Sequence, residues 1–180
     1  MVVGQPNFTA IKPVVVDAKS VRAPQGVWIQ GGKLYVADTL NNRVLIWNRI
    51  PTSNEQAADV VLGQPDFNTA PQPDLTKAEL NAQPQTLLNP VSVTTDGLRL
   101  YVTDLGHNRV LIWNSIPTRN QQPADLEIGQ KDMQTATPND STNLCPSNGT
   151  DSDGKATYPE RCGKTLSFPR FALSDGKRLF

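Results

Sequence analysis

The chain of 180 residues carries 17 basic and 17 acidic side chains, so no overall field draws it to nucleic acid or to an anionic membrane. This length fits one good-sized core, and 15 prolines with 12 glycines disfavour an all-helical domain. No apolar run reaches the roughly 18–20 residues that span a bilayer, and the start, MVVGQPNFTA, lacks the basic region and long apolar core of a secretory signal.

The first predicted element is a strand at the N-terminus. Residues Val2–Phe8 read VVGQPNF and match VLGQPDF at Val61–Phe67. Because the later copy ends a unit of four strand-like segments, residues 1–8 are predicted to be the last strand of a preceding unit.

The first complete unit covers residues 24–64. Its turn residues are Gly31-Gly32 and Asn41-Asn42, which accept positive φ more readily than most residues. The segments between the turns are rich in Val, Ile, Leu, Tyr and Trp, which predicts strands. The predicted strands are Gly26–Ile29, Lys33–Asp38, Arg43–Asn48 and Asp59–Gly63.

A linker rich in Pro and Gln, residues 65–89, follows the first unit. Thr76 and Glu79 have the spacing of a capping box, which predicts a short helix over Thr76–Ala82.

The second unit, residues 90–130, repeats the first at a shift of 66 residues (104 − 38 for the aspartates Asp38 and Asp104) without a gap in the matching part. Self-similarity at a fixed period predicts a repeat architecture, in which one unit packs against copies of itself. Its predicted strands are Ser92–Thr95, Arg99–Asp104, Arg109–Asn114 and Asp125–Ile128. A cysteine-bearing insert, residues 131–168, follows, and residues 169–180 restart the pattern of Pro90–Gly97 at a shift of 79 (169 − 90).

The predicted fold is all-β. Four short antiparallel strands in sequence form one propeller blade, and the runs LYVA and RVLIW are continuously apolar, so both faces of each sheet should be covered. Radially stacked blades cover one another in this way, whereas a β-sandwich would show cleaner alternation and no duplication. We therefore expect an arc of a β-propeller with two complete blades and a partial blade at each end.

The segments ADTLNNRVLIWN (37–48) and TDLGHNRVLIWN (103–114) resemble NHL repeats, the units of six-bladed propellers, in the bacterial type with long VLGQPDF-like links. The resemblance implies a scaffold that binds proteins, peptides, RNA or small ligands. It also implies an alternative, because some relatives are metal-dependent lyases or hydrolases. The chain departs from the family in having two whole repeats and two partial ones.

Two charged pairs flank the equivalent turns of the units, Asp38 with Arg43 and Asp104 with Arg109. They could grip a ligand, or each Asp could cap turn amides while each Arg bridges back to it or to the neighbouring blade. Their recurrence in both units favours the structural interpretation.

The aromatic residues divide into repeated and unrepeated positions. Trp47 and Trp113 are equivalent and are expected to pack between blades, whereas Trp28 has no aromatic counterpart and is expected to fill a local gap rather than face a ligand. His107 is the only histidine and stands where the first unit has Asn41. A single histidine in a turn is a weak basis for catalysis or metal binding, which need several converging groups.

Cys145 and Cys162 lie in the insert, 17 residues apart (162 − 145). They could be incidental thiols, or a disulfide that adds roughly 3 kcal/mol by closing the loop. A short polar segment has few other ways to become ordered, so a disulfide and an oxidising, extracytoplasmic compartment are predicted. That compartment disagrees with the absence of a signal sequence at the start of this chain.

The insert also resembles a calcium loop, because Asp151, Asp153, Gly154 and Glu160 follow the D-x-D-G-x₅-E part of the pattern. Gly149 stands at the first ligand position and supplies no carboxylate, so a polar disulfide loop is favoured over a calcium site. Calcium is the single cofactor that the sequence raises.

The sequence as a whole predicts a non-catalytic, extracytoplasmic binding scaffold for an unidentified protein, peptide or small ligand. The alternative is part of a propeller enzyme, a metal-dependent lyase or hydrolase with its site in a central channel. The two ends should leave apolar faces bare. A fragment of a larger propeller explains this most simply, and a homodimer that completes the ring head to tail is the alternative.

Overall fold

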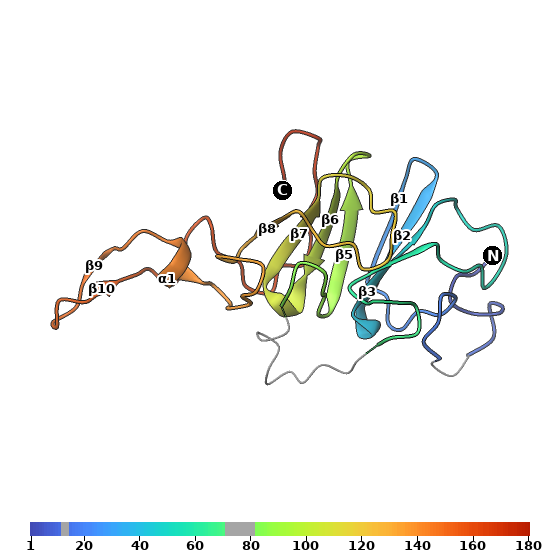
Figure 1. Cartoon of the computed structure of the whole chain (residues 1–180), viewed down its shortest axis with the longest axis horizontal. Helices are drawn as coiled ribbons and strands as arrows, with labels where there is room; N and C mark the ends of the chain where they lie inside the picture. Colours follow the sequence, from blue (N-terminus) through green and yellow to red (C-terminus); the bar gives the residue numbers. More distant parts are fainter. Residues whose placement is uncertain (12–14, 71–81) are drawn as a thin grey trace.

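Residues 1–11, 15–70 and 82–180 are described by the computed structural model, which has two antiparallel four-stranded sheets. In each sheet the strands are adjacent in chain order (Figure 1). The first sheet consists of β1 (Gly26–Gln30), β2 (Lys33–Asp38), β3 (Arg43–Trp47) and β4 (Val60–Leu62). The second sheet consists of β5 (Pro90–Thr95), β6 (Leu100–Asp104), β7 (Arg109–Trp113) and β8 (Leu126–Ile128). The prediction of an all-β fold with antiparallel four-stranded sheets is confirmed.

The turns follow from residues that accept positive φ. Gly31 and Gly32, with φ of 58° and 74°, close the hairpin of β1 and β2. The second and third strands of each sheet are joined by one turn of 3₁₀ helix, η1 (Thr39–Asn41) and η3 (Leu105–His107). Asn42 and Asn108 end these turns in the left-handed region, with φ of 53° and 54°. Asparagine tolerates this conformation better than most residues.

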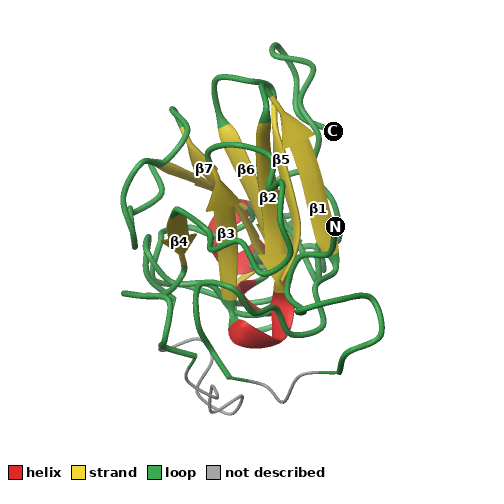
Figure 2. Cartoon of the chain, turned by 90° about the vertical axis from the view of Figure 1, so that its right-hand side faces the viewer, coloured by secondary structure: helices red, strands yellow, loops and turns green. Residues whose placement is uncertain are grey.

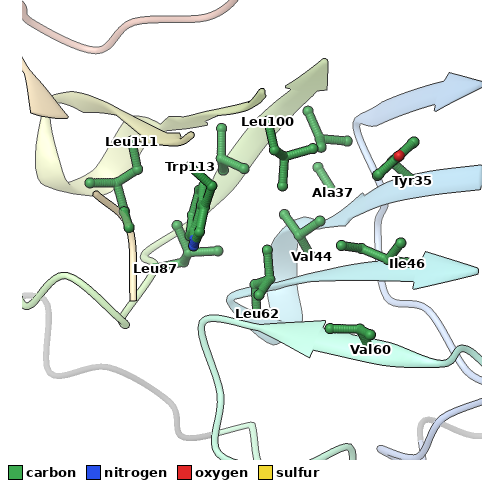
Figure 3. Close-up of a cluster of buried hydrophobic side chains, with 13 residues drawn as sticks. Tyr35, Ala37, Val44, Ile46, Val60, Leu62, Leu87, Leu100, Leu111 and Trp113 are labelled. Atoms are coloured by element: carbon green, nitrogen blue, oxygen red, sulfur yellow. The ribbon is translucent and has the colours of Figure 1, made fainter. Parts of the chain in front are cut away.

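The main core lies between the two sheets, which stack face to face (Figure 2). The first sheet contributes Tyr35, Ala37, Val44, Ile46, Val60 and Leu62, and the second contributes Leu100, Leu111 and Trp113 (Figure 3) together with Val93 and Val102. Leu87, from the segment before β5, and Ala124, from the connection before β8, complete the contact. We call this set the inter-sheet core. Burial of this much apolar surface is the main force that holds the sheets together.

The opposite face of β2, β3 and β4 is also buried, which explains the continuously apolar strands. It includes Trp47, and flanking segments cover it with Val3, Val21 and Phe67. Trp113 lies between the sheets as expected, whereas Trp47 packs under these segments. Trp28 is partly buried against the inter-sheet core.

The strand predicted for Val2–Phe8 does not form. A strand needs a hydrogen-bonded neighbour, and the described chain places none beside this segment. The segment is nevertheless held as β4 is held: the Val2 amide donates to Asn54 Oδ1 over 2.9 Å, and the Val61 amide of β4 donates to Asn120 Oδ1 over 3.1 Å.

Residues 169–180 form a short hairpin rather than full strands. Ser174 pairs with Leu179, and Leu173 and Phe180 exchange backbone hydrogen bonds of 2.9 and 2.8 Å. The insert contains a short helix, α1 (Ser141–Leu144), and a two-stranded hairpin, β9 (Gly149–Thr150) with β10 (Ala156–Thr157). This hairpin projects away from both sheets (Figure 1). The helix predicted over Thr76–Ala82 lies outside the described residues, except for Ala82.

A test of the contact between the first sheet and the following linker uses Gly63. Its φ is +89°, and a Cβ there would lie 2.7 Å from the Asn42 carbonyl oxygen and 2.9 Å from Leu87 Cβ. We expect Gly63→Ala to lower the free energy of unfolding by about 3 kcal/mol, because backbone strain adds to the clash. The control Gly31→Ala has φ of +58° but no neighbour within 4 Å, and should cost about 1 kcal/mol in urea denaturation. Equal losses in the two variants would contradict the close contact with Leu87.

Candidate functional site

Asp38, the last residue of β2, and Arg43, the first residue of β3, face each other across the turn and are fully buried. Arg43 Nε donates to Asp38 Oδ2 over 2.7 Å. Its two terminal nitrogens donate to backbone carbonyls: Nη1 to Phe67 over 2.6 Å, and Nη2 to Asp17 and Ser20 over 2.9 Å each. Arg43 therefore binds the segment before its own sheet and the segment after it.

Contrary to expectation, Asp38 does not cap the turn amides, and no side-chain hydrogen bond caps η1. Its Oδ1 accepts the backbone amide of Arg22 over 2.6 Å, and its Oδ2 also accepts Asn41 Nδ2 over 2.9 Å. The carboxylate thus holds an amide of the segment that leads into β1. A buried carboxylate needs such donors, since it has lost its hydration.

The second sheet repeats this arrangement. Arg109 Nε donates to Asp104 Oδ2 over 2.9 Å, and both side chains are fully buried. Arg109 Nη1 donates to the carbonyl of Met133 over 2.7 Å, and Nη2 donates to the carbonyls of Gln83 and Thr86 over 2.9 and 3.1 Å. We call the two sets the arginine networks.

His107 takes the place of Asn41 in the second network. Its Nδ1 lies 2.8 Å from Asp104 Oδ2, and the side chain is buried. The backbone amide of Leu88 donates to Asp104 Oδ1 over 2.7 Å, as Arg22 does to Asp38. His107 therefore serves the carboxylate as a neighbour within the fold, and it is not presented to solvent.

The pKa of Asp104 reflects these contacts. Burial by itself raises the pKa, but the charge and hydrogen bond of His107, the charge of Arg109 and the Leu88 amide outweigh burial and lower it below the usual aspartate value. The unfolded chain has an aspartate pKa of about 3.9. The ionised Asp104 therefore stabilises the fold above that pH, and this contribution is lost as the pH falls through the lower folded value.

Two more repeated polar residues extend the networks: Asn42, which the sequence marked only as a turn residue, and Gln64, which it did not single out. Gln64 Nε2 donates to the Asn42 carbonyl over 3.0 Å, and Asn42 Oδ1 accepts the amide of Asn89 over 2.8 Å. The second sheet repeats both contacts over 2.9 and 3.0 Å with Gln130, Asn108 and Phe168. Their recurrence as Asn108 and Gln130, 66 residues later in the chain, is the sequence signal that could have identified them.

The arginine networks are closed to ligands. Each Asp–Arg pair is fully buried, and the guanidinium nitrogens are bound to the carboxylate and to backbone carbonyls. A ligand in solution would have to displace these contacts to reach the charges. The arrangement holds segments between strands and leaves no open charged pair for binding.

The disulfide predicted between Cys145 and Cys162 is confirmed, with Cα atoms 5.9 Å apart. We call residues 145–162 the arm. None of residues 146–161 is buried, so the arm has no apolar core of its own. Its shape is held by the disulfide at its base and by hydrogen bonds within the β9–β10 hairpin.

Asp151, which the calcium pattern included, serves the tip of the arm. Its Oδ1 accepts the amides of Asp153 and Lys155 over 3.0 and 2.9 Å. The structure does not bring Asp151, Asp153 and Glu160 together as a metal site. More generally, across residues 1–11, 15–70 and 82–180, no three His, Cys, Asp or Glu side chains form a group that could hold a metal ion.

Comparison with known proteins adds no identity. No protein-family model matches the chain, and no curated protein is significantly similar to it. Within the part of the chain that the structure describes, no helix has the length and apolar character needed to cross a membrane. The geometry of the arginine networks and of the arm is therefore the basis for assigning a function.

Asn41 and His107 occupy equivalent positions, so the first sheet shows how an asparagine serves the carboxylate that His107 contacts in the second. We expect His107→Asn to lower the free energy of unfolding by less than about 1 kcal/mol, because an amide donor performs this role in the first sheet. His107→Leu removes the donor to a buried carboxylate and should cost about 2–3 kcal/mol in urea denaturation. A leucine variant as stable as the asparagine variant would show that the contact with Asp104 contributes nothing.

Proposed function

We propose that the chain is an arc of an NHL-like β-propeller that works as a non-catalytic binding scaffold and presents the arm to a partner. The two stacked meander sheets with matching register support the blade interpretation. The sequence resemblance to NHL repeats supports it independently. On this interpretation the first and second sheets are adjacent blades.

The arm is the observation that carries the proposal. The repeated residues of this chain are used in the cores and in the arginine networks. The arm is unrepeated, exposed and cross-linked, and its hairpin hydrogen bonds stay within it. Ordering a solvated segment has an entropic cost that burial does not offset here. A segment held in one shape without contributing to the core is suited to binding a partner, since less entropy is lost on association.

The arm also supports an extracytoplasmic location. Disulfides persist in oxidising compartments and are rare where thiols are kept reduced. Because the arm has no buried side chains between its cysteines, its order depends on the cross-link, so a reducing compartment would loosen the proposed contact surface. The ligand class that fits such a hairpin is a peptide or protein surface.

Deletion of the arm tests this function. Residues 147–160 are replaced by a short Gly-Ser segment that keeps Cys145 and Cys162, and a displayed random peptide library is selected against the wild-type chain. Enriched peptides should bind the shortened variant at least about tenfold more weakly, while its free energy of unfolding changes by less than about 1 kcal/mol. Binding is measured by titration calorimetry.

The matched control is Arg119→Ala, an exposed change in the connection between β7 and β8. It should leave peptide binding unchanged. Peptides that bind the shortened variant as tightly as the wild type would place the binding surface elsewhere and contradict the role of the arm.

A further inference from the structure

The contact between the two sheets shows which side chains this repeat uses to join neighbouring units. The inter-sheet core contains Tyr35 of β2, and Trp28 of β1 packs against it. Both belong to the first sheet. Among the residues they join are Leu62 of β4 and Leu87 of the linker, both labelled in Figure 3, and Val93 and Val102 of the second sheet.

The residues that pack with Trp28 and Tyr35 in this contact have equivalents on the outer side of the first sheet, where no sheet covers them. Val27, Val36 and Val21 correspond to Val93, Val102 and Leu87 at the shift of 66 residues (93 − 27, 102 − 36 and 87 − 21). Val3 corresponds to Leu62 through the matching GQP segments (62 − 3 = 59). With Pro24, Gln25 and Gly26, these four valines line an open apolar hollow of about 220 Å³. Val27 is 67% exposed, whereas its counterpart Val93 is 1% exposed.

The C-terminal hairpin, residues 169–180, carries the equivalents of Trp28 and Tyr35, the two side chains that the first sheet packs against the second. Leu173 and Phe180 correspond to Thr94 and Tyr101 at the shift of 79 residues, and therefore to Trp28 and Tyr35 of the first sheet (173 − 79 − 66 = 28; 180 − 79 − 66 = 35). Phe180 is 65% exposed, and Tyr35 is 1% exposed.

The hairpin is already held in the orientation that this correspondence requires. Thr94 Oγ1 donates to the Ala172 carbonyl over 2.7 Å, and Ser174 Oγ donates to Asp96 Oδ2 over 3.2 Å. Ala172 is buried against the second sheet, and Leu179 packs beside it. Since successive side chains of an extended segment point to opposite faces, Leu173 and Phe180 face away from the second sheet.

We propose that the C-terminal hairpin of one copy of this chain packs its Leu173 and Phe180 into the hollow lined by Val3, Val21, Val27 and Val36 of a second copy. This contact repeats between chains the one that joins the two sheets within a chain. The occupant is a second copy because both halves of the contact are present on every chain, one at each end of the stacked sheets.

Phe171 is the one position where the internal contact cannot be copied unchanged. Its equivalent in the first sheet is Gly26, where a Cβ would lie 2.8 Å from the Val91 carbonyl oxygen. Phe171 is 60% exposed, and the residues it would meet on the second copy, Gln25 and Gly26, line the hollow. Since the nearest atoms at Gly26 are backbone atoms, the contact between two copies must be wider at Phe171 than the contact between the two sheets.

The proposed contact is heterologous, because a hairpin meets a hollow and not another hairpin. It deepens the blade interpretation by naming a partner for the end faces, and it does not involve the arm. Failure of self-association would leave the binding role of the arm standing, and loss of peptide binding on arm deletion would not affect self-association.

The test is sedimentation equilibrium of the full chain and three lysine variants. The wild type should associate reversibly, with a mass that rises above that of one chain as concentration increases. Val27→Lys damages the hollow and Phe180→Lys damages the hairpin, and each should weaken association at least about tenfold. Tyr158→Lys, an exposed change in the arm, is the control and should associate as the wild type does.

Mixing the two damaged variants distinguishes this contact from a symmetric one. The Val27→Lys chain keeps an intact hairpin and the Phe180→Lys chain keeps an intact hollow, so the mixture should form a heterodimer that neither variant forms alone. Should Val27→Lys fail to fold by circular dichroism, Val27→Thr, a smaller polar change at the same lining residue, replaces it. A wild type that stays monomeric at all concentrations, or a mixture that associates no better than its components, would overturn the proposal.

Discussion

The buried pair of an aspartate and an arginine is the interaction on which the rest of the structure depends. Asp38 with Arg43, and Asp104 with Arg109, are fully buried, so each pair has lost its hydration. Loss of hydration is tolerable only where the remaining donors and acceptors find partners. The partners are backbone groups of segments that belong to no strand of either main sheet. Each pair therefore stabilises the fold in two ways: by the attraction between the two charges, and by the hydrogen bonds that hold the connecting segments in place.

This arrangement explains why the two sheets are alike and why they stack. Each arginine binds a carbonyl of the segment after its sheet and two carbonyls of the segment before it. The chain consequently enters and leaves each sheet along the same path. Leu87 is thereby placed against Gly63, and the inter-sheet core can form with one register. The arm is outside this system, which is consistent with its having a disulfide of its own.

Much of the fold follows from the sequence, because apolar runs such as RVLIW and the turn residues Gly31 and Asn42 act locally. The Asp–Arg pairs also followed from their recurrence. Their carbonyl partners, such as Phe67 and Met133, did not, because every residue has a backbone carbonyl and its use leaves no mark on the sequence. The prediction of an N-terminal strand was wrong because a strand forms only beside a hydrogen-bonded neighbour, which the sequence of the segment alone does not specify. Helix α1 and strands β9 and β10 are too short to produce a periodic pattern.

Native-state hydrogen exchange on Arg43→Met and Arg109→Met tests the central claim most directly, since exchange reports local opening residue by residue. Loss of Arg43 should remove protection selectively from residues 17–22 and 64–69, and loss of Arg109 from residues 83–88 and 133–136. In each variant the strands of the other sheet should keep their protection. Protection lost equally over both sheets, or only within the strands that carry the substitution, would contradict the claim that each arginine holds the links on either side of its sheet.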